Sequence, residues 1–295
     1  MTETYRQDDL VELKQTKTTF VGVDSDGCVF DTMEIKQKIC FHPLILSHWK
    51  LEPIEQYVRE SAEFVNLYSK TRGSNRFIGL IKSIDLIRNR PEVIDSGVKL
   101  PDFTELRKFI DSGIALGNPA LEKAVAETGN KELAEVLEWS LAINKSVSKK
   151  VKNLPPFKWV IESLEKIKEN SDLIVVSQTP CEALVREWNE NDMTKYVEFI
   201  AGQEHGTKTE HIKLATAGKY EPDKILMIGD ALGDRIAAKA NNALFYAINP
   251  TREEESWERF YKEAYDKFLE GTYEGKYEQM VIDEFEALLP ENPSW

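Results

Sequence analysis

A short run of apolar and β-branched residues, 19–23, leads directly into Asp24, Asp26 and Gly27. Strands buried on both faces of a parallel sheet form such runs, so the pattern predicts a central strand that delivers two carboxylates to one edge of a sheet. Side chains alternate along a strand, so Asp24 and Asp26 start on the same side, and Gly27 allows a sharp turn. A solvated turn also fits this string, whereas a calcium loop is disfavoured because its glycine belongs at the sixth position.

Two later segments repeat this arrangement of an apolar run followed by a polar residue and a turn. Residues 171–176 lead to Ser177, and residues 225–229 lead to Asp230, with Asp234 in the first turn of the helix that follows. Helix capping explains one such aspartate, but it does not explain acids at two of three strand ends. Several carboxylates held together need a compensating cation or proton, and oxygen-rich ligation of this kind suits magnesium.

The order of these motifs resembles that of the haloacid dehalogenase superfamily of phosphohydrolases. Residues 24–27 are similar to its first motif, Ser177 to its second and residues 229–234 to its fourth. The third motif is a lysine at the start of a helix, for which Lys208 is the best positioned candidate and Lys213 the rival.

The resemblance, which covers residues 20–31 and roughly residues 155–248, implies an α/β fold with a doubly wound, Rossmann-like parallel sheet. We expect a discontinuous core made of residues 1–31 and 155–295, with a C-terminal helical extension from about residue 251. Residues 32–154 read almost entirely as helix and have the size of a domain. They are expected to form an α-helical cap domain inserted after the first strand.

The resemblance also implies a division of labour among the motif residues. Asp24 attacks phosphorus and becomes an aspartyl phosphate, while Asp26 protonates the leaving oxygen and later activates water. Mg²⁺ is implied at Asp24, the backbone carbonyl of Asp26 and Asp230, with Asp234 acting through water or orienting Lys208.

Further residues are implied to bind the substrate. Ser177 donates a hydrogen bond to a phosphoryl oxygen, and Lys208 balances the charge of the transferred group. Gln178 is also expected to bind the substrate. A basic turn in the inserted segment offers Arg72 and Arg76 as a clamp for the leaving group. A solvated loop between helices is the alternative for either arginine.

Asp26 favours phosphoester chemistry, because members of the superfamily that cleave carbon–halogen or carbon–phosphorus bonds need no acid at this position. The sequence therefore predicts a magnesium-dependent phosphohydrolase that acts on a small phosphorylated metabolite. A phosphomutase would retain both acids and stays open. A non-catalytic protein that binds a phosphate ligand on the same scaffold is the second alternative.

Composition limits the classes of molecule that the protein is expected to bind. The 295 residues carry a formal net charge of −13 at pH 7, which argues against binding nucleic acid or anionic membranes. The N-terminus lacks the features of a signal peptide, and three cysteines fit free thiols, so a cytoplasmic protein is expected. An aromatic stripe over residues 257–269 must be covered by the core, by the cap or by a second copy in a homodimer.

Overall fold

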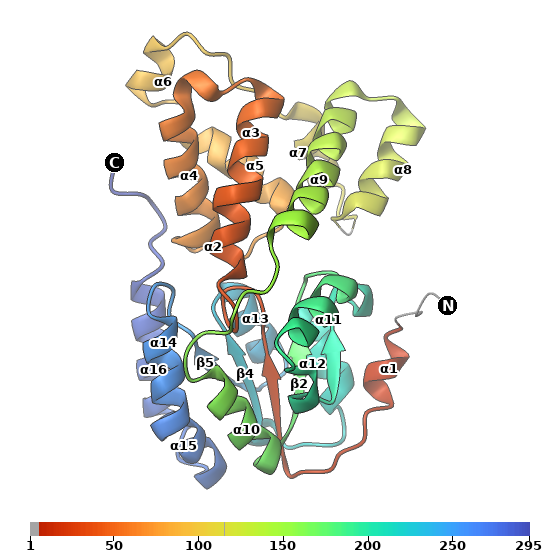
Figure 1. Cartoon of the computed structure of the whole chain (residues 1–295), viewed down its shortest axis with the longest axis vertical. Helices are drawn as coiled ribbons and strands as arrows, with labels where there is room; N and C mark the ends of the chain where they lie inside the picture. Colours follow the sequence, from red (N-terminus) through yellow and green to blue (C-terminus); the bar gives the residue numbers. More distant parts are fainter. Residues whose placement is uncertain (1–5, 115) are drawn as a thin grey trace. The chain divides into compact units, whose positions relative to one another are not determined.

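The computed structural model divides into two compact units, each described here by itself (Figure 1). It describes residues 6–114 and 116–295. Unit 1 extends to Met33 and resumes over Lys152–Pro290, whereas unit 2 comprises Glu34–Val151 and Glu291–Trp295. The two internal crossings lie within three residues of those expected, but the last five residues group with the helical unit 2.

Unit 1 is built on a five-stranded parallel sheet in the order β3-β2-β1-β4-β5. Its strands are β1 (Thr19–Val23), β2 (Ser171–Val176), β3 (Phe199–Ala201), β4 (Ile225–Gly229) and β5 (Leu244–Ala247). Every residue of β1 is buried and the strand is paired on both sides, as its apolar run predicts. The predicted fold class, a doubly wound α/β sheet accompanied by a helical unit, is confirmed.

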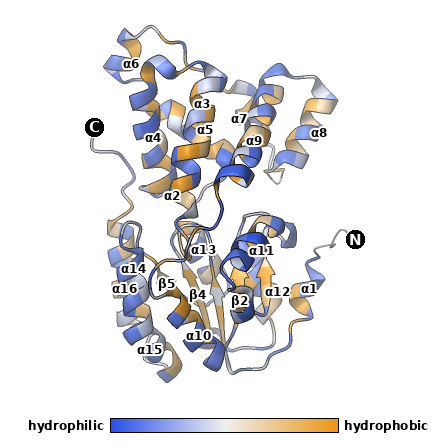
Figure 2. Ribbon diagram, viewed as in Figure 1, coloured by the Kyte–Doolittle hydropathy of each residue, from blue (hydrophilic) through white to orange (hydrophobic). Residues whose placement is uncertain are grey.

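Helices cover the sheet of unit 1. They are α1 (Asp8–Val11), α10 (Val160–Asn170), α11 (Cys181–Glu190), α12 (Lys208–Thr216), α13 (Leu232–Ala240), α14 (Glu253–Arg259), α15 (Tyr265–Glu270) and α16 (Lys276–Ala287). Helix α10 buries Val160, Leu164 and Ile167, which lie on one face, and in Figure 2 its ribbon carries both hydrophobic and hydrophilic colours. Such a helix packs one face on the sheet and leaves the other to solvent.

The register of the sheet positions the predicted motifs. Val23 of β1 lies beside Val175 of β2 and beside Ile228 of β4. The residues that follow these three strands therefore leave the sheet at the same edge, its carboxyl edge. Asp24 and Ser177 are among them.

The C-terminal layer of unit 1 is a continuous helical run, in which a π-helical turn at Phe260–Ala264 joins α14 to α15. Its aromatic stripe is packed in the core of unit 1 rather than exposed. The fully buried members of the stripe are Trp257, Phe260, Ala264, Tyr265 and Phe268. The first of the alternatives for covering this stripe is therefore the one observed.

Unit 2 is entirely helical and has a hydrophobic core of its own. Helix α2 (Thr32–Lys36) leads into it, followed by a π-helical turn (Gln37–Phe41), α3 (His42–Trp49), α4 (Glu55–Leu67), α5 (Arg76–Ile87), α6 (Pro91–Asp95), α7 (Thr104–Asp111), α8 (Asn118–Thr128) and α9 (Lys131–Lys150). No helix among the described residues combines the length and the apolar character needed to cross a membrane.

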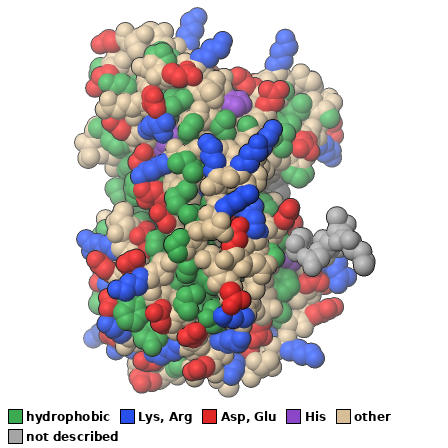
Figure 3. All heavy atoms as spheres, in the orientation of Figure 1, with side chains coloured by type: hydrophobic (Ala, Val, Ile, Leu, Met, Phe, Trp, Pro, Cys, Tyr) green, Lys and Arg blue, Asp and Glu red, His purple; other side chains and the backbone are tan. Residues whose placement is uncertain are grey.

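The last five residues contact α4 and its surroundings in unit 2. The Trp295 ring meets the Phe64 ring edge-on at 5.6 Å between centroids, and the Arg90 guanidinium lies 5.3 Å from the Trp295 ring centroid. Glu291 forms an exposed ion pair with Lys70 at 3.6 Å. On the face drawn in Figure 3, acidic and basic side chains are interspersed over each unit.

Candidate active site

Asp24 continues the ladder of β1 beyond the last strand residue, because its amide donates to the Ile228 carbonyl at 2.9 Å. Its carboxylate is buried, and its two oxygens accept hydrogen bonds from the Ser25 amide at 2.7 Å and from Lys208 Nζ at 2.7 Å. Burial raises the pKa of Asp24 well above its usual value, the ammonium of Lys208 opposes this, and neighbouring carboxylates add to it. A buried, fully oriented carboxylate thus stands at the end of the central strand.

Lys208 is the first residue of α12, as predicted. The helix is capped by Thr207, whose hydroxyl accepts from the Glu210 amide, while the Glu210 carboxylate accepts from the Thr207 amide at 2.7 Å. This reciprocal cap fixes where the helix begins and hence the origin of the Lys208 side chain. The rival, Lys213, is exposed.

The ammonium of Lys208 bridges two carboxylates, at 2.7 Å from Asp24 Oδ2 and 2.6 Å from Asp234 Oδ1. Burial works to lower the pKa of Lys208, but the attraction of Asp234 and Asp24 prevails and raises it above its usual value. Lys208 is therefore held as a cation at the carboxyl edge of the sheet.

Asp24, Asp230 and Asp234 form a buried acidic cluster, with one carboxylate oxygen of each within 4.8 Å of the others. Within residues 6–114 and 116–295 it is the one group of such side chains close enough to hold a metal ion. Counted as ionised, the three carboxylates and Lys208 carry a surplus of two negative charges. Hard oxygen donors with this surplus fit a divalent cation such as Mg²⁺. The side chain of Asp26 is not part of the cluster.

Asp234 serves the helix and the site at once. Its Oδ2 accepts from the Ala231 amide at 3.0 Å, which caps α13, while its Oδ1 accepts from Lys208. Gly229 makes this possible, since a Cβ there would collide with Cβ, Cγ and Oδ2 of Asp234. Helix capping and site geometry are thus both functions of the same residue.

Asp26 lies in a tight turn that Gly27 closes with a φ of 76°. The carboxylate of Asp26 accepts from Thr179 Oγ1 at 2.7 Å and from Thr32 Oγ1. Neither threonine was predicted as a site residue. Thr179 could have been found from its place two residues after Ser177, whereas nothing in the local sequence pattern marks Thr32.

Ser177 and Gln178 follow β2 directly. The buried Ser177 pairs its amide with the Ala201 carbonyl at 3.0 Å, and its hydroxyl accepts from the Thr179 amide at 3.2 Å. The exposed Gln178 donates through Nε2 to the Gly206 carbonyl at 2.9 Å. Gln178 thereby ties the loop after β2 to the turn before α12.

One family model matches part of the chain. Residues 111–248 match the model of the haloacid dehalogenase-like hydrolases, and the match includes Ser177, Lys208 and the two aspartates of the fourth motif. Over these residues the chain is similar to the haloacid dehalogenase-like hydrolases. The resemblance inferred from the motifs is confirmed. A search of curated protein sequences gave no significant match.

Solved structures similar to this chain have low sequence identity. A haloacid dehalogenase-like family hydrolase from Streptococcus pneumoniae is 16% identical, with 82% of this chain and 90% of that chain covered and a TM-score of 0.45. One from Xanthomonas campestris is 10% identical, with 89% and 97% covered and a TM-score of 0.44. A protein described as a predicted phosphoglycolate phosphatase from Haemophilus somnus is 16% identical, with 79% and 86% covered and a TM-score of 0.43. At such scores these likenesses carry no weight for the activity of this chain.

The two arginines predicted in the inserted segment both lie in unit 2. Arg72 is buried and donates through Nη1 to the Leu67 carbonyl at 2.8 Å. Arg76 opens α5, and its Nη1 donates to the carbonyl and hydroxyl of Ser140 and to Asn144 Oδ1. Burial lowers the pKa of Arg76 to about 10. Each of these guanidinium groups thus donates to groups of unit 2.

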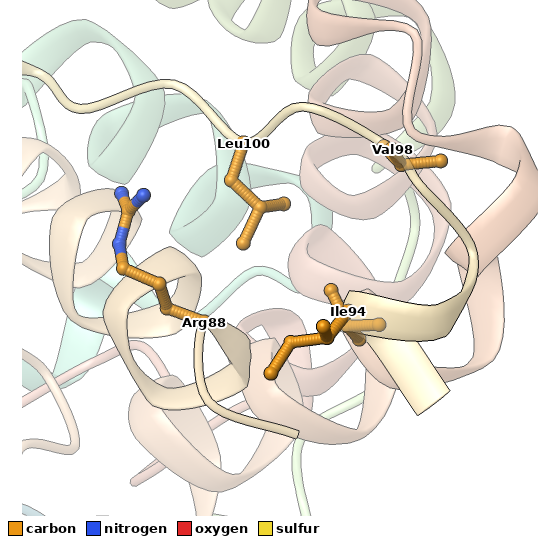
Figure 4. Close-up of a pocket in the computed structure, with 5 residues that line it drawn as sticks. Arg88, Ile94, Val98 and Leu100 are labelled. Atoms are coloured by element: carbon orange, nitrogen blue, oxygen red, sulfur yellow. The ribbon is translucent and has the colours of Figure 1, made fainter. Parts of the chain in front are cut away.

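A shallow hollow of about 160 Å³ opens on unit 2, lined by Arg88, Val93, Ile94, Val98 and Leu100 (Figure 4). Arg88 uses its two Nη atoms on the Pro101 carbonyl and on the Asp102 carboxylate. None of the predicted site residues lines this hollow, and we assign no role to it.

Proposed function

We propose that this protein is a Mg²⁺-dependent phosphatase that cleaves a small phosphorylated metabolite through a phosphorylated Asp24. One observation carries the proposal: a buried carboxylate, Asp24, is paired with a lysine that also binds Asp234, beside a third buried carboxylate, Asp230. This is the arrangement of charge that an aspartate nucleophile, a phosphoryl group and a divalent cation need together.

In the first step, Oδ of Asp24 forms a bond to phosphorus as the bond between phosphorus and the ester oxygen breaks. Asp26 donates a proton to that departing oxygen, so the leaving group departs as an alcohol. Lys208 offsets the negative charge of the transferred group, and the hydroxyl of Ser177 donates to one of its oxygens.

In the second step, Asp26 takes a proton from water, the water oxygen bonds to phosphorus, and the bond to Asp24 breaks to release phosphate. Asp26 must therefore work in both protonation states. The hydroxyls of Thr32 and Thr179 suit this requirement, because each can donate to a carboxylate or accept from a carboxylic acid.

The donor set of the site fits Mg²⁺. Asp24, Asp230 and the backbone carbonyl of Asp26 would hold the ion, with Asp234 orienting Lys208. When bound, Mg²⁺ supplies charge neutralisation that lets an anionic substrate approach an anionic pocket. Gln178, in the loop after β2, is proposed to help bind the phosphoryl group. Arg72 and Arg76 are proposed to bind the leaving group.

A panel of phosphate monoesters incubated with the protein and Mg²⁺ tests the proposal by the release of inorganic phosphate. We expect turnover of at least one ester and its loss in Asp24→Asn. Addition of EDTA should abolish turnover, and Mg²⁺ in excess should restore it. Full activity in Asp24→Asn, or no turnover of any ester, would count against the proposal.

The two lysines of α12 provide a matched pair of variants. Lys208→Met removes a charge from the site and should lower kcat by about a hundredfold or more. Lys213→Met removes an exposed charge from the same helix and should leave kcat unchanged. Accumulation of an isomerised sugar phosphate instead of free phosphate would indicate a mutase.

A further inference from the structure

Two tryptophan side chains contact the loop that carries Asp24 and Asp26. Nε1 of Trp188 donates to the Ser25 hydroxyl at 3.0 Å, and Nε1 of Trp257 donates to the Cys28 carbonyl at 2.8 Å. Both indoles are fully buried. The loop is thus held by a side-chain donor near each of its ends.

The two indoles belong to different parts of unit 1. Trp188 lies on α11, which follows β2, and its ring meets the Phe30 ring edge-on at 6.1 Å between centroids. Trp257 lies on α14, in the C-terminal layer, 229 residues along the chain from Cys28. The bond from Trp188 links the loop to a helix that directly follows a neighbouring strand of the sheet. The bond from Trp257 links the loop to the C-terminal helical layer.

The contact from Trp257 is short compared with the other hydrogen bonds of Cys28. The Cys28 amide donates to the Ser25 carbonyl at 3.4 Å, and the Cys28 thiol donates to the Ile228 carbonyl at 3.9 Å. Both of these bonds are long and therefore weak. The Trp257 N–H binds the carbonyl of this peptide unit at 2.8 Å, and the amide of the same unit, Val29 N–H, donates to the Ser25 carbonyl at 2.9 Å. Trp257 is thus the contact that ties this peptide unit to the C-terminal layer.

The position of Cys28 matters because the loop turns back on itself within a few residues. Gly27 donates to the Phe30 carbonyl at 2.8 Å, and Asp26 pairs with Phe30 in a β-bridge. Cys28 lies inside this turn, so a shift of its carbonyl displaces the turn and Asp26 with it. Catalysis is sensitive to such shifts, since a misplacement of about 1 Å can cost about a hundredfold in rate.

We infer that Trp257 is a positioning residue: its indole N–H fixes the Cys28 carbonyl and thereby the orientation of Asp26, which makes the C-terminal helical layer part of the catalytic apparatus. This inference rests on the proposed phosphatase function for its kinetic consequence. Its structural consequence, a Cys28 carbonyl held by the Trp257 N–H in addition to the backbone bonds of the loop, holds whatever the substrate is.

The test is Trp257→Phe, which keeps an aromatic ring in the core and deletes the donor. Replacement of Trp257 by benzothienylalanine is the second variant, because sulfur takes the place of the N–H while both rings stay. Tyr246→Phe is the matched control. It removes a buried hydrogen bond from the Tyr246 hydroxyl, on β5, to the Ser256 carbonyl of α14 at 2.6 Å, and this bond does not involve the loop.

Three measurements separate positioning from general destabilisation. We expect kcat on an ester found in the panel to fall about tenfold or more in both Trp257 variants, with KM within about twofold. Tyr246→Phe should lower the unfolding midpoint and leave kcat and KM unchanged.

Amide hydrogen exchange of residues 24–30 provides a readout that needs no substrate. Exchange there should accelerate in both Trp257 variants and stay at the wild-type rate in Tyr246→Phe. Unchanged exchange overturns the inference, as does faster exchange with an unaltered kcat in an active enzyme. If wild-type protein hydrolyses no ester, the proposed function has failed, and the exchange rates alone decide whether Trp257 fixes the loop.

Discussion

Substitution of Gly229 by alanine should displace Asp234 and so disrupt the acidic cluster of Asp24, Asp230 and Asp234. Gly229 ends β4, and a Cβ there would lie well inside 3.0 Å of three atoms of Asp234, closer than Cβ atoms approach their neighbours in proteins. One of the three is Cβ of Asp234, which is fixed to the backbone of α13. Rotation of the Asp234 side chain therefore cannot relieve the collision, and the helix must move away from the strand.

The expected cost combines two effects. Overpacking a tight site costs about 1–3 kcal/mol, and each buried hydrogen bond to a charged group contributes about 1.5–3 kcal/mol. Displacing Asp234 breaks its bond to Lys208 and its bond to the Ala231 amide. We expect Gly229→Ala to lower the free energy of unfolding by about 3 kcal/mol or more, and the proposed phosphatase activity to fall with it.

Gly233 provides the control within the same motif. It is exposed in α13, and a Cβ there meets nothing within 4 Å. Gly233→Ala should raise the free energy of unfolding by about 0.5–1 kcal/mol, because alanine loses less backbone entropy on entering a helix. Urea unfolding followed by circular dichroism measures both values. If Gly229→Ala proves as stable as Gly233→Ala, then Asp234 is not packed against the end of β4, and the cluster is assembled differently.

Two further predictions concern buried polar groups away from the site. Burial lowers the pKa of His42 from 6.5 to about 3, and neither ring nitrogen has a hydrogen-bond partner. The unfolded chain therefore binds a proton that the folded protein excludes, and stability is lost as the pH falls from 6.5 towards 3, by about 1.4 kcal/mol per pH unit. His42→Leu should flatten this acid slope in urea unfolding at pH 7, 6 and 5, whereas His48→Gln on the same helix should keep it; equal slopes in all three proteins would refute the assignment. Asp172 accepts hydrogen bonds from the Thr16 and Lys17 amides at 2.9 Å each and from the Tyr220 hydroxyl. Asp172→Asn should lower the free energy of unfolding by about 2 kcal/mol, compared with under about 1 kcal/mol for Asp266→Asn, which breaks a surface pair with Lys166; a smaller loss at position 172 than at 266 would contradict this.

The sheet could be predicted from the sequence because strands buried on both faces leave continuous apolar runs. The start of α9 was equally readable, since Asn130 caps it and accepts from the Leu133 amide. The apolar face of α9 is harder to predict. Leu141 lies eight residues after Leu133, a spacing that places both on one face of a helix, yet Leu141 is 44% exposed. Trp139 and Ile143 are buried instead. The packing of neighbouring helices decides which side of a helix is covered, and no single helix encodes it.

The strand-end acids and Lys208 could be predicted because each follows a local signal, an apolar run or a helix start. Thr32, Thr179 and Trp257 act through hydrogen bonds whose partners are set by the three-dimensional fold. The bond between Thr179 and Asp26 joins residues 153 positions apart, and that from Trp257 to Cys28 joins residues 229 positions apart. The hydrophobic periodicity of a dozen neighbouring residues therefore cannot predict such long-range pairs.

The grouping of Glu291–Trp295 with the helical unit means that the chain passes between the two units three times rather than twice. An insertion between two strands can be excised or exchanged as a cassette, because both of its ends return to the same place. In this protein, removal of residues 34–151 would expose a tryptophan, because Trp295 would lose the Phe64 ring and the Arg90 guanidinium that it contacts. Anyone who shortens, tags or recombines this enzyme must therefore treat its final residues and its helical unit as one module.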